Sequence, residues 1–253
     1  MDLCDRLALG ADRYAFLIGG GGKTSLMFAL ARELAGGGRS VLTTTSTRIL
    51  EPGPDDSPLV VVSADMAPLL EQLRAGLRDR VHVTAGRSRV GDRHEKLAGF
   101  APGELDVLEA AAVADVVLVE ADGSAGRPLK AHLEHEPVLS ERAGLVIVVI
   151  GLSAIGEPAT DATVHRAARW CERANLPPGH VLTADEVAAM VFHPEGYLKK
   201  VPPRARVALF LSQAGTAIAR ASGEALREAV LRRDRDRRIE RVVVGELREP
   251  LAP

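Results

Sequence analysis

Aromatic residues, cysteines and net charge are all scarce in this sequence. Aromatic side chains make up 3% of the 253 residues, so the core must consist mainly of Ala, Val and Leu. The two cysteines, Cys4 and Cys171, show neither metal-site spacing nor a disulfide framework, which fits a reducing compartment. The formal net charge is −2, so we expect no broad electrostatic contact with DNA or RNA.

Long hydrophobic runs are also missing from the sequence. The longest, at residues 116–119 and 145–150, are far shorter than the roughly 20 apolar residues of a membrane-spanning helix. Residues 1–6 contain several charges and lack the apolar centre of a signal peptide. We therefore expect a cytoplasmic protein without a membrane partner.

Short apolar runs alternate with amphipathic stretches along the chain. Strands are predicted at residues 14–18, 40–44, 59–63, 80–84, 115–120, 145–150, 206–211 and 239–244. Helices are predicted at 24–35, 65–79, 102–114, 159–175, from about 183, and at 214–232, with a loop at 86–103. This order predicts a doubly wound α/β fold with a mostly parallel sheet. We expect residues 1–253 to form a single domain that can include a small subregion at 180–204.

The most informative segment is FLIGGGGKTSLMFALA, at residues 16–31. A predicted strand leads into four glycines, then a lysine and two hydroxyl residues at the start of a predicted helix. Bare backbone N–H groups can approach phosphate oxygens, the lysine can reach the outer phosphates, and a hydroxyl can bind Mg²⁺. The segment predicts a P-loop NTPase-like fold in which a nucleotide is bound by Gly19, Gly20, Gly21, Gly22, Lys23, Thr24 and Ser25.

The loop is shorter than the common phosphate-binding pattern. The pattern G-x-x-x-x-G-K-[ST] requires glycine where this chain has Leu17, which leaves G-x-x-G-K-T. That shorter form resembles the loop of the Mur-ligase and folylpolyglutamate-synthetase group.

An acidic strand end follows at residues 116–122, VVLVEAD, which has Walker B character. Glu120 and Asp122 are two residues apart, so both can face one site at the end of a strand. A carboxylate in this position can hold Mg²⁺ or its water shell. We predict Lys23, Glu120 and Asp122 as catalytic residues, and Thr24, Glu120 and Asp122 as the residues that bind Mg²⁺.

Other polar residues near this predicted edge allow two interpretations each. Thr43 and Thr45 either face the ligand or are present because threonine favours strands. Lys130 is positioned to contact a phosphate or another anion. Four further residues also allow two interpretations each. His132 and His135 either bind a metal or make local hydrogen bonds. Local hydrogen bonds are likewise the alternative to proton transfer by His165 and to phosphate binding by Arg166.

Several of these segments together resemble the selenium-dependent hydroxylase accessory protein family, labelled YqeC. The resemblance rests on residues 19–25, 43–47, 119–124, 128–130 and 135–137, and on Gly151, Leu152, Gly156 and residues 164–166. The segment VEADGS is its most specific part. The resemblance implies a nucleotide-binding role in the maturation of molybdenum hydroxylases that use a labile selenium. It also implies such a hydroxylase, or the enzymes that handle its cofactor, as partners.

The identity of the nucleotide depends on the last strands. The strand predicted at 206–211 ends in SQAG, which lacks the aspartate of the N-K-x-D motif that contacts guanine in many G proteins. ATP is therefore preferred, and GTP remains open. The leading function is Mg²⁺-dependent binding of a nucleoside triphosphate, with hydrolysis or phosphoryl transfer. The alternatives are a non-catalytic carrier of a phosphate-bearing, molybdopterin-type cofactor and an ATP-dependent ligase or kinase.

Overall fold

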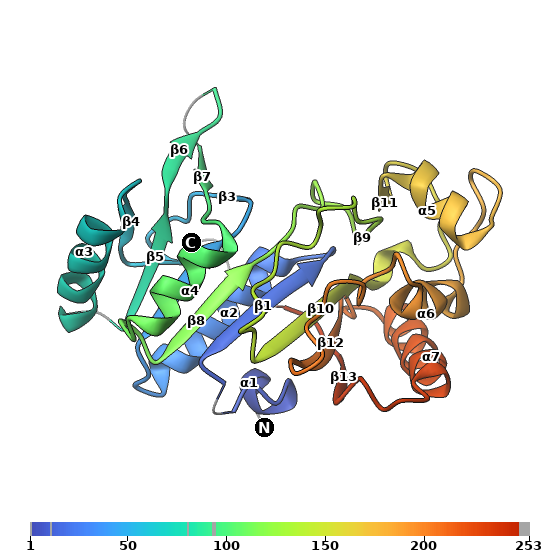
Figure 1. Ribbon diagram of the computed structural model, residues 1–253. Helices are drawn as coiled ribbons and strands as arrows, with labels where there is room; N and C mark the ends of the chain where they lie inside the picture. Colours follow the sequence, from blue (N-terminus) through green and yellow to red (C-terminus); the bar gives the residue numbers. More distant parts are fainter. Residues whose placement is uncertain (1, 11, 80, 93–94, 248–253) are drawn as a thin grey trace.

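A computed structural model describes residues 2–10, 12–79, 81–92 and 95–247. The strands of its main sheet are β1 (Tyr14–Gly19), β2 (Val41–Thr45), β4 (Val60–Val62), β5 (His82–Gly86), β8 (Val116–Glu120), β10 (Leu145–Gly151), β12 (Arg206–Ser212) and β13 (Arg241–Val244). They are arranged in the order β13-β12-β10-β1-β8-β2-β5-β4, and every pairing is parallel (Figure 1). The predicted α/β class with a parallel sheet is confirmed.

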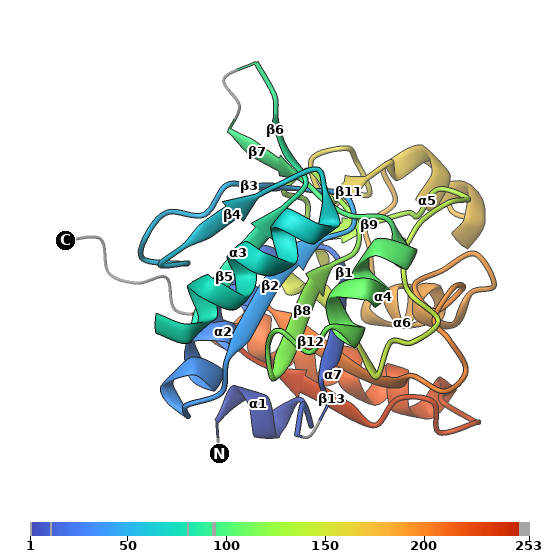
Figure 2. The same ribbon diagram turned by 60° about the vertical axis from the view of Figure 1, so that its left-hand side comes forward.

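Helices cover both faces of this sheet (Figures 1 and 2). They are α1 (Leu3–Arg6), α2 (Lys23–Gly36), α3 (Met66–Asp79), α4 (Pro102–Ala110), α5 (Ala167–Ala174), α6 (Ala184–Phe192) and α7 (Ala217–Arg233), with a short 3₁₀ helix, η1 (Leu152–Ala154). Residues of α2 pack in one hydrophobic cluster, and residues of α3 to α7 pack in the other. The sheet is therefore wound on both sides, as the P-loop NTPase-like fold requires.

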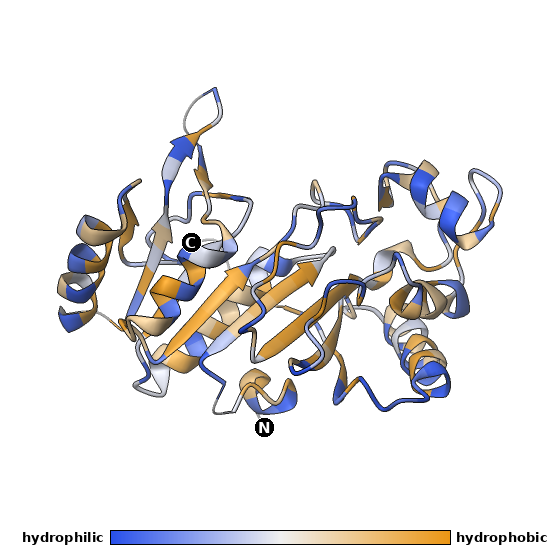
Figure 3. Cartoon of the chain, in the orientation of Figure 1, coloured by the Kyte–Doolittle hydropathy of each residue, from blue (hydrophilic) through white to orange (hydrophobic). Residues whose placement is uncertain are grey.

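The central strand shows why the sheet is buried on both faces. Phe16 and Ile18 of β1 belong to one cluster, whereas Ala15 and Leu17 belong to the other. Successive side chains of a strand point to opposite faces, so a strand covered on both sides must be apolar throughout. The central strands are accordingly coloured as hydrophobic in Figure 3. Among the described residues, no helix has the length and apolar character needed to cross a bilayer.

Some short elements were not predicted. The expected loop at 86–103 contains β6 (Ser88–Val90) and β7 (Lys96–Ala98), and β7 pairs antiparallel with both β6 and β3 (Arg48–Leu50). Ile49 and Leu97 are the buried residues of these strands, so a three-residue strand offers too little alternation to be recognised. Helix α1 was also missed, and residue 80, where one predicted strand begins, lies outside the described residues.

The helix predicted at 159–175 begins later than expected. Residues Val164–His165 form a short strand, β11, that pairs in parallel with β9 (Leu129–Lys130). Arg166 then has a positive φ of 66°, which interrupts helical geometry, and α5 follows. This small parallel pair holds the segment after β8 beside the segment after β10, at the carboxyl edge of the main sheet (Figure 1).

Candidate functional site

The four glycines connect β1 to α2 in a conformation that other residues would adopt with difficulty. Gly19, Gly21 and Gly22 have φ values of 100°, 82° and 108°, in the region where L-residues are strained. Gly20 is constrained by space instead, because a Cβ there would lie 2.6 Å from the carbonyl oxygen of Arg127. The loop therefore needs glycine for two reasons: backbone geometry and close approach of a neighbouring chain segment.

The backbone amides of the loop divide into two groups. Three already have acceptors: the Asp122 carboxylate for Gly19 (3.0 and 3.1 Å), the Val149 carbonyl for Gly20 (2.9 Å) and the Arg127 carbonyl for Gly21 (3.0 Å). The next four have no acceptor in the described part of the chain: Gly22, Lys23, Thr24 and Ser25. These four lie at the N-terminus of α2, where free N–H groups and the helix dipole favour an anion.

A cavity of about 850 Å³ opens beside these free amides. Gly22, Thr24 and Ser25 line it at the start of α2. The residues that line its other parts include the apolar Phe28, Leu50 and Leu247, the charged Arg32, Glu51, Asp56 and Glu246, and the polar Ser212 and Gln213. The volume lies in the range of small-molecule binding sites, and the lining combines apolar and polar groups.

The Lys23 side chain turns toward the acidic strand end. Its Nζ is buried, donates to the carbonyl oxygen of Gly19 (2.7 Å), and lies 3.1 Å from Asp122 Oδ1 and 3.8 Å from Glu120 Oε1. Burial alone would lower the pKa of Lys23, but the two carboxylates outweigh it, so the pKa is raised. The lysine is therefore a buried cation whose charge is already balanced by these carboxylates.

Asp122 is the centre of a buried charge network. Its carboxylate lies 3.4 Å from Lys130 Nζ and 2.6 Å from His132 Nε2, in addition to Lys23 and the Gly19 amide. Burial would raise the pKa of Asp122, but the lysine charges and the His132 hydrogen bond hold it well below its usual range. Asp122 is therefore a stable anion that does not depend on any single partner.

Glu120 and Thr24 form the second polar contact between strand and helix. Thr24 Oγ1 donates to Glu120 Oε2 at 2.6 Å. Burial raises the pKa of Glu120, although the charge of Lys23 opposes this effect. Among the described residues, no group of three or more His, Cys, Asp or Glu side chains could hold a metal ion. The hydroxyl and carboxylate nevertheless suit Mg²⁺, which usually takes one or two protein oxygens and completes its shell with water and phosphate.

A second group of charges fixes the segment after β8. Glu136 lies 3.2 Å from Lys130 Nζ, and Arg166 donates to Glu136 Oε2 (2.7 Å) and to the carbonyl oxygen of Ala131 (2.9 Å). Burial lowers the pKa of Lys130 despite its two carboxylate neighbours. Arg166 thus ties β11 to the segment after β8, and it does not line the cavity beside the glycine loop.

The remaining histidines and threonines lie outside that cavity. His135 is exposed, while burial and the charge of Arg166 lower the pKa of the half-buried His165. Thr43 Oγ1 contacts Thr84 Oγ1 (2.7 Å) and His82 Nε2 (2.9 Å), and Thr45 Oγ1 donates to the Glu120 carbonyl (2.7 Å). Both hydroxyls therefore connect neighbouring strands.

Sequence reasoning compared the end of β12 with a guanine-contacting motif but did not identify Ser212, Gln213, Glu246 and Leu247 as residues that line the cavity. Ser212 is the last residue of β12 and donates to the Gly21 carbonyl at 2.6 Å, which supports the loop from the opposite side to Asp122. Gln213, Glu246 and Leu247 line the cavity from the ends of β12 and β13. These residues could have been found from the sequence because they follow two predicted strands, and ligands bind beyond the carboxyl ends of adjacent parallel strands.

Comparison with known proteins places this site in a family. The family model described as "YqeC protein" matches residues 16–168, which include the glycine loop, β8 and Arg166. The chain belongs to the YqeC family. A YqeC relative from Escherichia coli (strain K12), described as "Uncharacterized protein YqeC", is 36% identical over 197 residues. That similarity covers 78% of this chain and 74% of the relative.

Proposed function

We propose that this YqeC-family protein binds a Mg²⁺–nucleoside triphosphate at the start of α2 and hydrolyses it or transfers its phosphoryl group. The observation that carries the proposal is the set of four free amides, Gly22 to Ser25, beside a cavity of about 850 Å³. The buried cation Lys23 and the acidic strand end adjoin those amides. Phosphoryl-transfer enzymes rely on this combination of positioning and charge stabilisation.

Each residue has a distinct role in this proposal. The amides of residues 22–25 hold phosphate oxygens, and Thr24 with Glu120 supplies oxygen ligands for Mg²⁺. Lys23 exchanges Asp122 for the outer phosphates. Asp122 can release the lysine because Lys130 and His132 remain beside it. A bound Mg²⁺ would neutralise charge on the phosphates and orient them.

The biological setting is also part of the proposal. The family resemblance supports a cytoplasmic accessory role in the maturation of selenium-dependent molybdenum hydroxylases, with the hydroxylase or its cofactor-handling enzymes as partners. The nucleotide triphosphate of this role is ATP or GTP. The same free amides would also hold the phosphate of a molybdopterin-type cofactor, so nucleotide binding and turnover must be measured directly.

Calorimetry with a non-hydrolysable nucleoside triphosphate and Mg²⁺ tests the site. We expect binding by the native protein and a loss of about tenfold to a hundredfold in Lys23→Met, because one charge-assisted contact is removed. Lys200→Met, at an exposed lysine, is the matched control and should bind normally. Thr24→Ala should lose most of the Mg²⁺ dependence. Thermal unfolding of each variant checks that it is folded.

Two results would contradict the proposal. One is native protein that binds neither ATP nor GTP with Mg²⁺. The other is folded Lys23→Met protein with unchanged affinity. Phosphate release that needs an added acceptor would identify a ligase or kinase, whereas tight retention of a phosphate-bearing pterin without turnover would identify a carrier.

A further inference from the structure

The residues after β12 include no acidic side chain, but an acidic side chain from the next strand lies beside them. The residues after β12 are Gln213, Ala214 and Gly215, none of which carries a carboxylate. Glu246 comes from the end of the adjacent strand β13, and a Cβ on Gly215 would lie 3.2 Å from its Oε2. The carboxylate that the sequence motif lacks is therefore supplied by the neighbouring strand.

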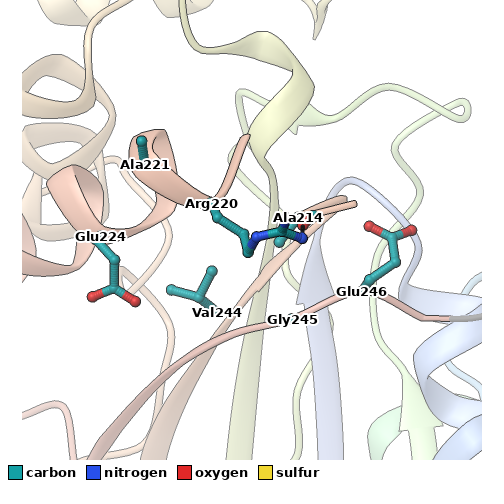
Figure 4. A pocket seen from close by; sticks show the side chains of 7 residues that line it. All are labelled: Ala214, Arg220, Ala221, Glu224, Val244, Gly245 and Glu246. Atoms are coloured by element: carbon teal, nitrogen blue, oxygen red, sulfur yellow. Dashed lines mark hydrogen bonds between the residues drawn. The ribbon is translucent and has the colours of Figure 1, made fainter. Parts of the chain in front are cut away.

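Glu246 connects two adjoining cavities. It lines the cavity of about 850 Å³ that begins at the free amides, and a second one of about 410 Å³ that Ala214, Arg220 and Val244 also line (Figure 4). The Glu246 side chain is exposed, and its carboxylate has no hydrogen bond or ion pair among the residues that the structure describes. Two carboxylate oxygens are thus free to accept hydrogen bonds at this junction.

Hydrogen-bond donors lie close to this carboxylate. Arg220 Nη1 donates to the carbonyl oxygens of Ala214 (3.1 Å) and Gly215 (3.3 Å), which fixes the guanidinium beside Ala214, in the cavity that Glu246 also lines (Figure 4). Its Nε and Nη2 have no acceptor in the described part of the chain. Gln213 Oε1 accepts from Ser153 Oγ (2.7 Å), which leaves the amide NH₂ group as a further donor.

We propose that Glu246 and Arg220 recognise a guanine base, so that the nucleotide of this site is a guanosine nucleotide. This inference rests on the proposed function. Guanine presents two adjacent donors, N1–H and N2–H, which match a carboxylate, and two acceptors, O6 and N7, which match an arginine. Adenine presents an acceptor at N1 beside its N6 donor, and that lone pair would face the second carboxylate oxygen. The structure thus favours GTP, whereas the strand-end motif alone favoured ATP.

Competitive binding of GTP, ATP and XTP with Mg²⁺ tests this assignment. The native protein should prefer GTP over ATP by about tenfold to a hundredfold, the range expected for one two-point base contact. Glu246→Gln should lose that preference and gain affinity for XTP, because its amide can donate to the xanthine O2 and accept from N1–H. Glu228→Gln, at an exposed glutamate of α7, is the matched control and should keep the native preference.

The outcomes separate this inference from the function on which it rests. If ATP binds as tightly as GTP, or if Glu246→Gln leaves the GTP-to-XTP ratio unchanged, the guanine assignment is overturned and nucleotide binding stands. If none of the three nucleotides binds, both proposals are overturned. Because Glu246 is exposed, its variants should fold, and thermal unfolding confirms this.

Discussion

The buried carboxylate of Asp122 should make a large contribution to stability, and Asp122→Asn measures it. The substitution keeps the shape of the side chain but removes the charge that faces Lys23 and Lys130. It also points an NH₂ group at groups that carry only donor hydrogens, since the Gly19 amide donates to this carboxylate and both lysine ammonium groups lie beside it. Removal of one partner from a buried ion pair costs about 3–5 kcal/mol. We expect the lower end, about 3 kcal/mol, because Lys23 and Lys130 each retain a glutamate neighbour.

Urea unfolding at several pH values is the assay. The pKa of Asp122 is lowered in the folded protein, so its contribution is present above the unfolded-state pKa of about 4 and is lost as the pH falls toward the folded value. The difference between native protein and Asp122→Asn should thus be constant from pH 5 to 8 and shrink below about pH 4. Asp55→Asn, at an exposed aspartate, should change stability by less than about 0.5 kcal/mol. A cost below about 1 kcal/mol for Asp122→Asn at pH 7 would refute the reasoning.

Two further predictions concern the glycine loop and His82 of β5. Gly20→Ala should destabilise the protein by about 2 kcal/mol in urea unfolding, because the new Cβ would lie 2.6 Å from the Arg127 carbonyl oxygen. Gly36→Ala is the control and should be neutral or stabilising, because a Cβ there would meet nothing within 4 Å. Equal effects of the two substitutions would contradict this prediction. Burial lowers the pKa of His82 to about 4 in the folded protein. The unfolded chain therefore takes up the imidazole proton at a higher pH than the folded protein does. As the pH falls from 6.5 to 4, the free energy of unfolding should consequently decrease by about 3 kcal/mol. His82→Gln should lack that part of the pH dependence, and an NMR titration of native His82 with a midpoint near 6.5 would contradict it.

The helices and strands that could be predicted from the sequence are those in which a hydrophobic pattern extends over several residues. The strands β1, β8 and β10 are five to seven residues long and fully buried, so they appear as uninterrupted apolar runs. The elements that were missed, such as β6 and β9, have two or three residues and no pattern of their own. Their existence depends on partners elsewhere in the chain, which local patterning does not reveal.

The candidate site likewise contains residues that could be predicted from the sequence and residues that could not. Lys23, Glu120 and Asp122 could be predicted to meet because each follows or ends a strand, and the structure places their charged groups within 4 Å. Which amides are free could not be predicted, since all four glycines look alike in sequence. Glu246 could not be predicted either, because its proximity to Gly215 follows from the pairing of β12 with β13.

The supports of the glycine loop have a consequence for biosynthesis. The carbonyls of Arg127 and Val149 accept from it, and Ser212, 191 residues after Gly21, donates to it. Ribosomes add about 5–20 residues per second, so the loop is synthesised roughly 10–40 seconds before its last support has been translated. A nascent chain shorter than this lacks the Ser212 contact that supports the proposed nucleotide site. Binding at the proposed nucleotide site is therefore expected to act on the finished polypeptide rather than on the early steps of its folding.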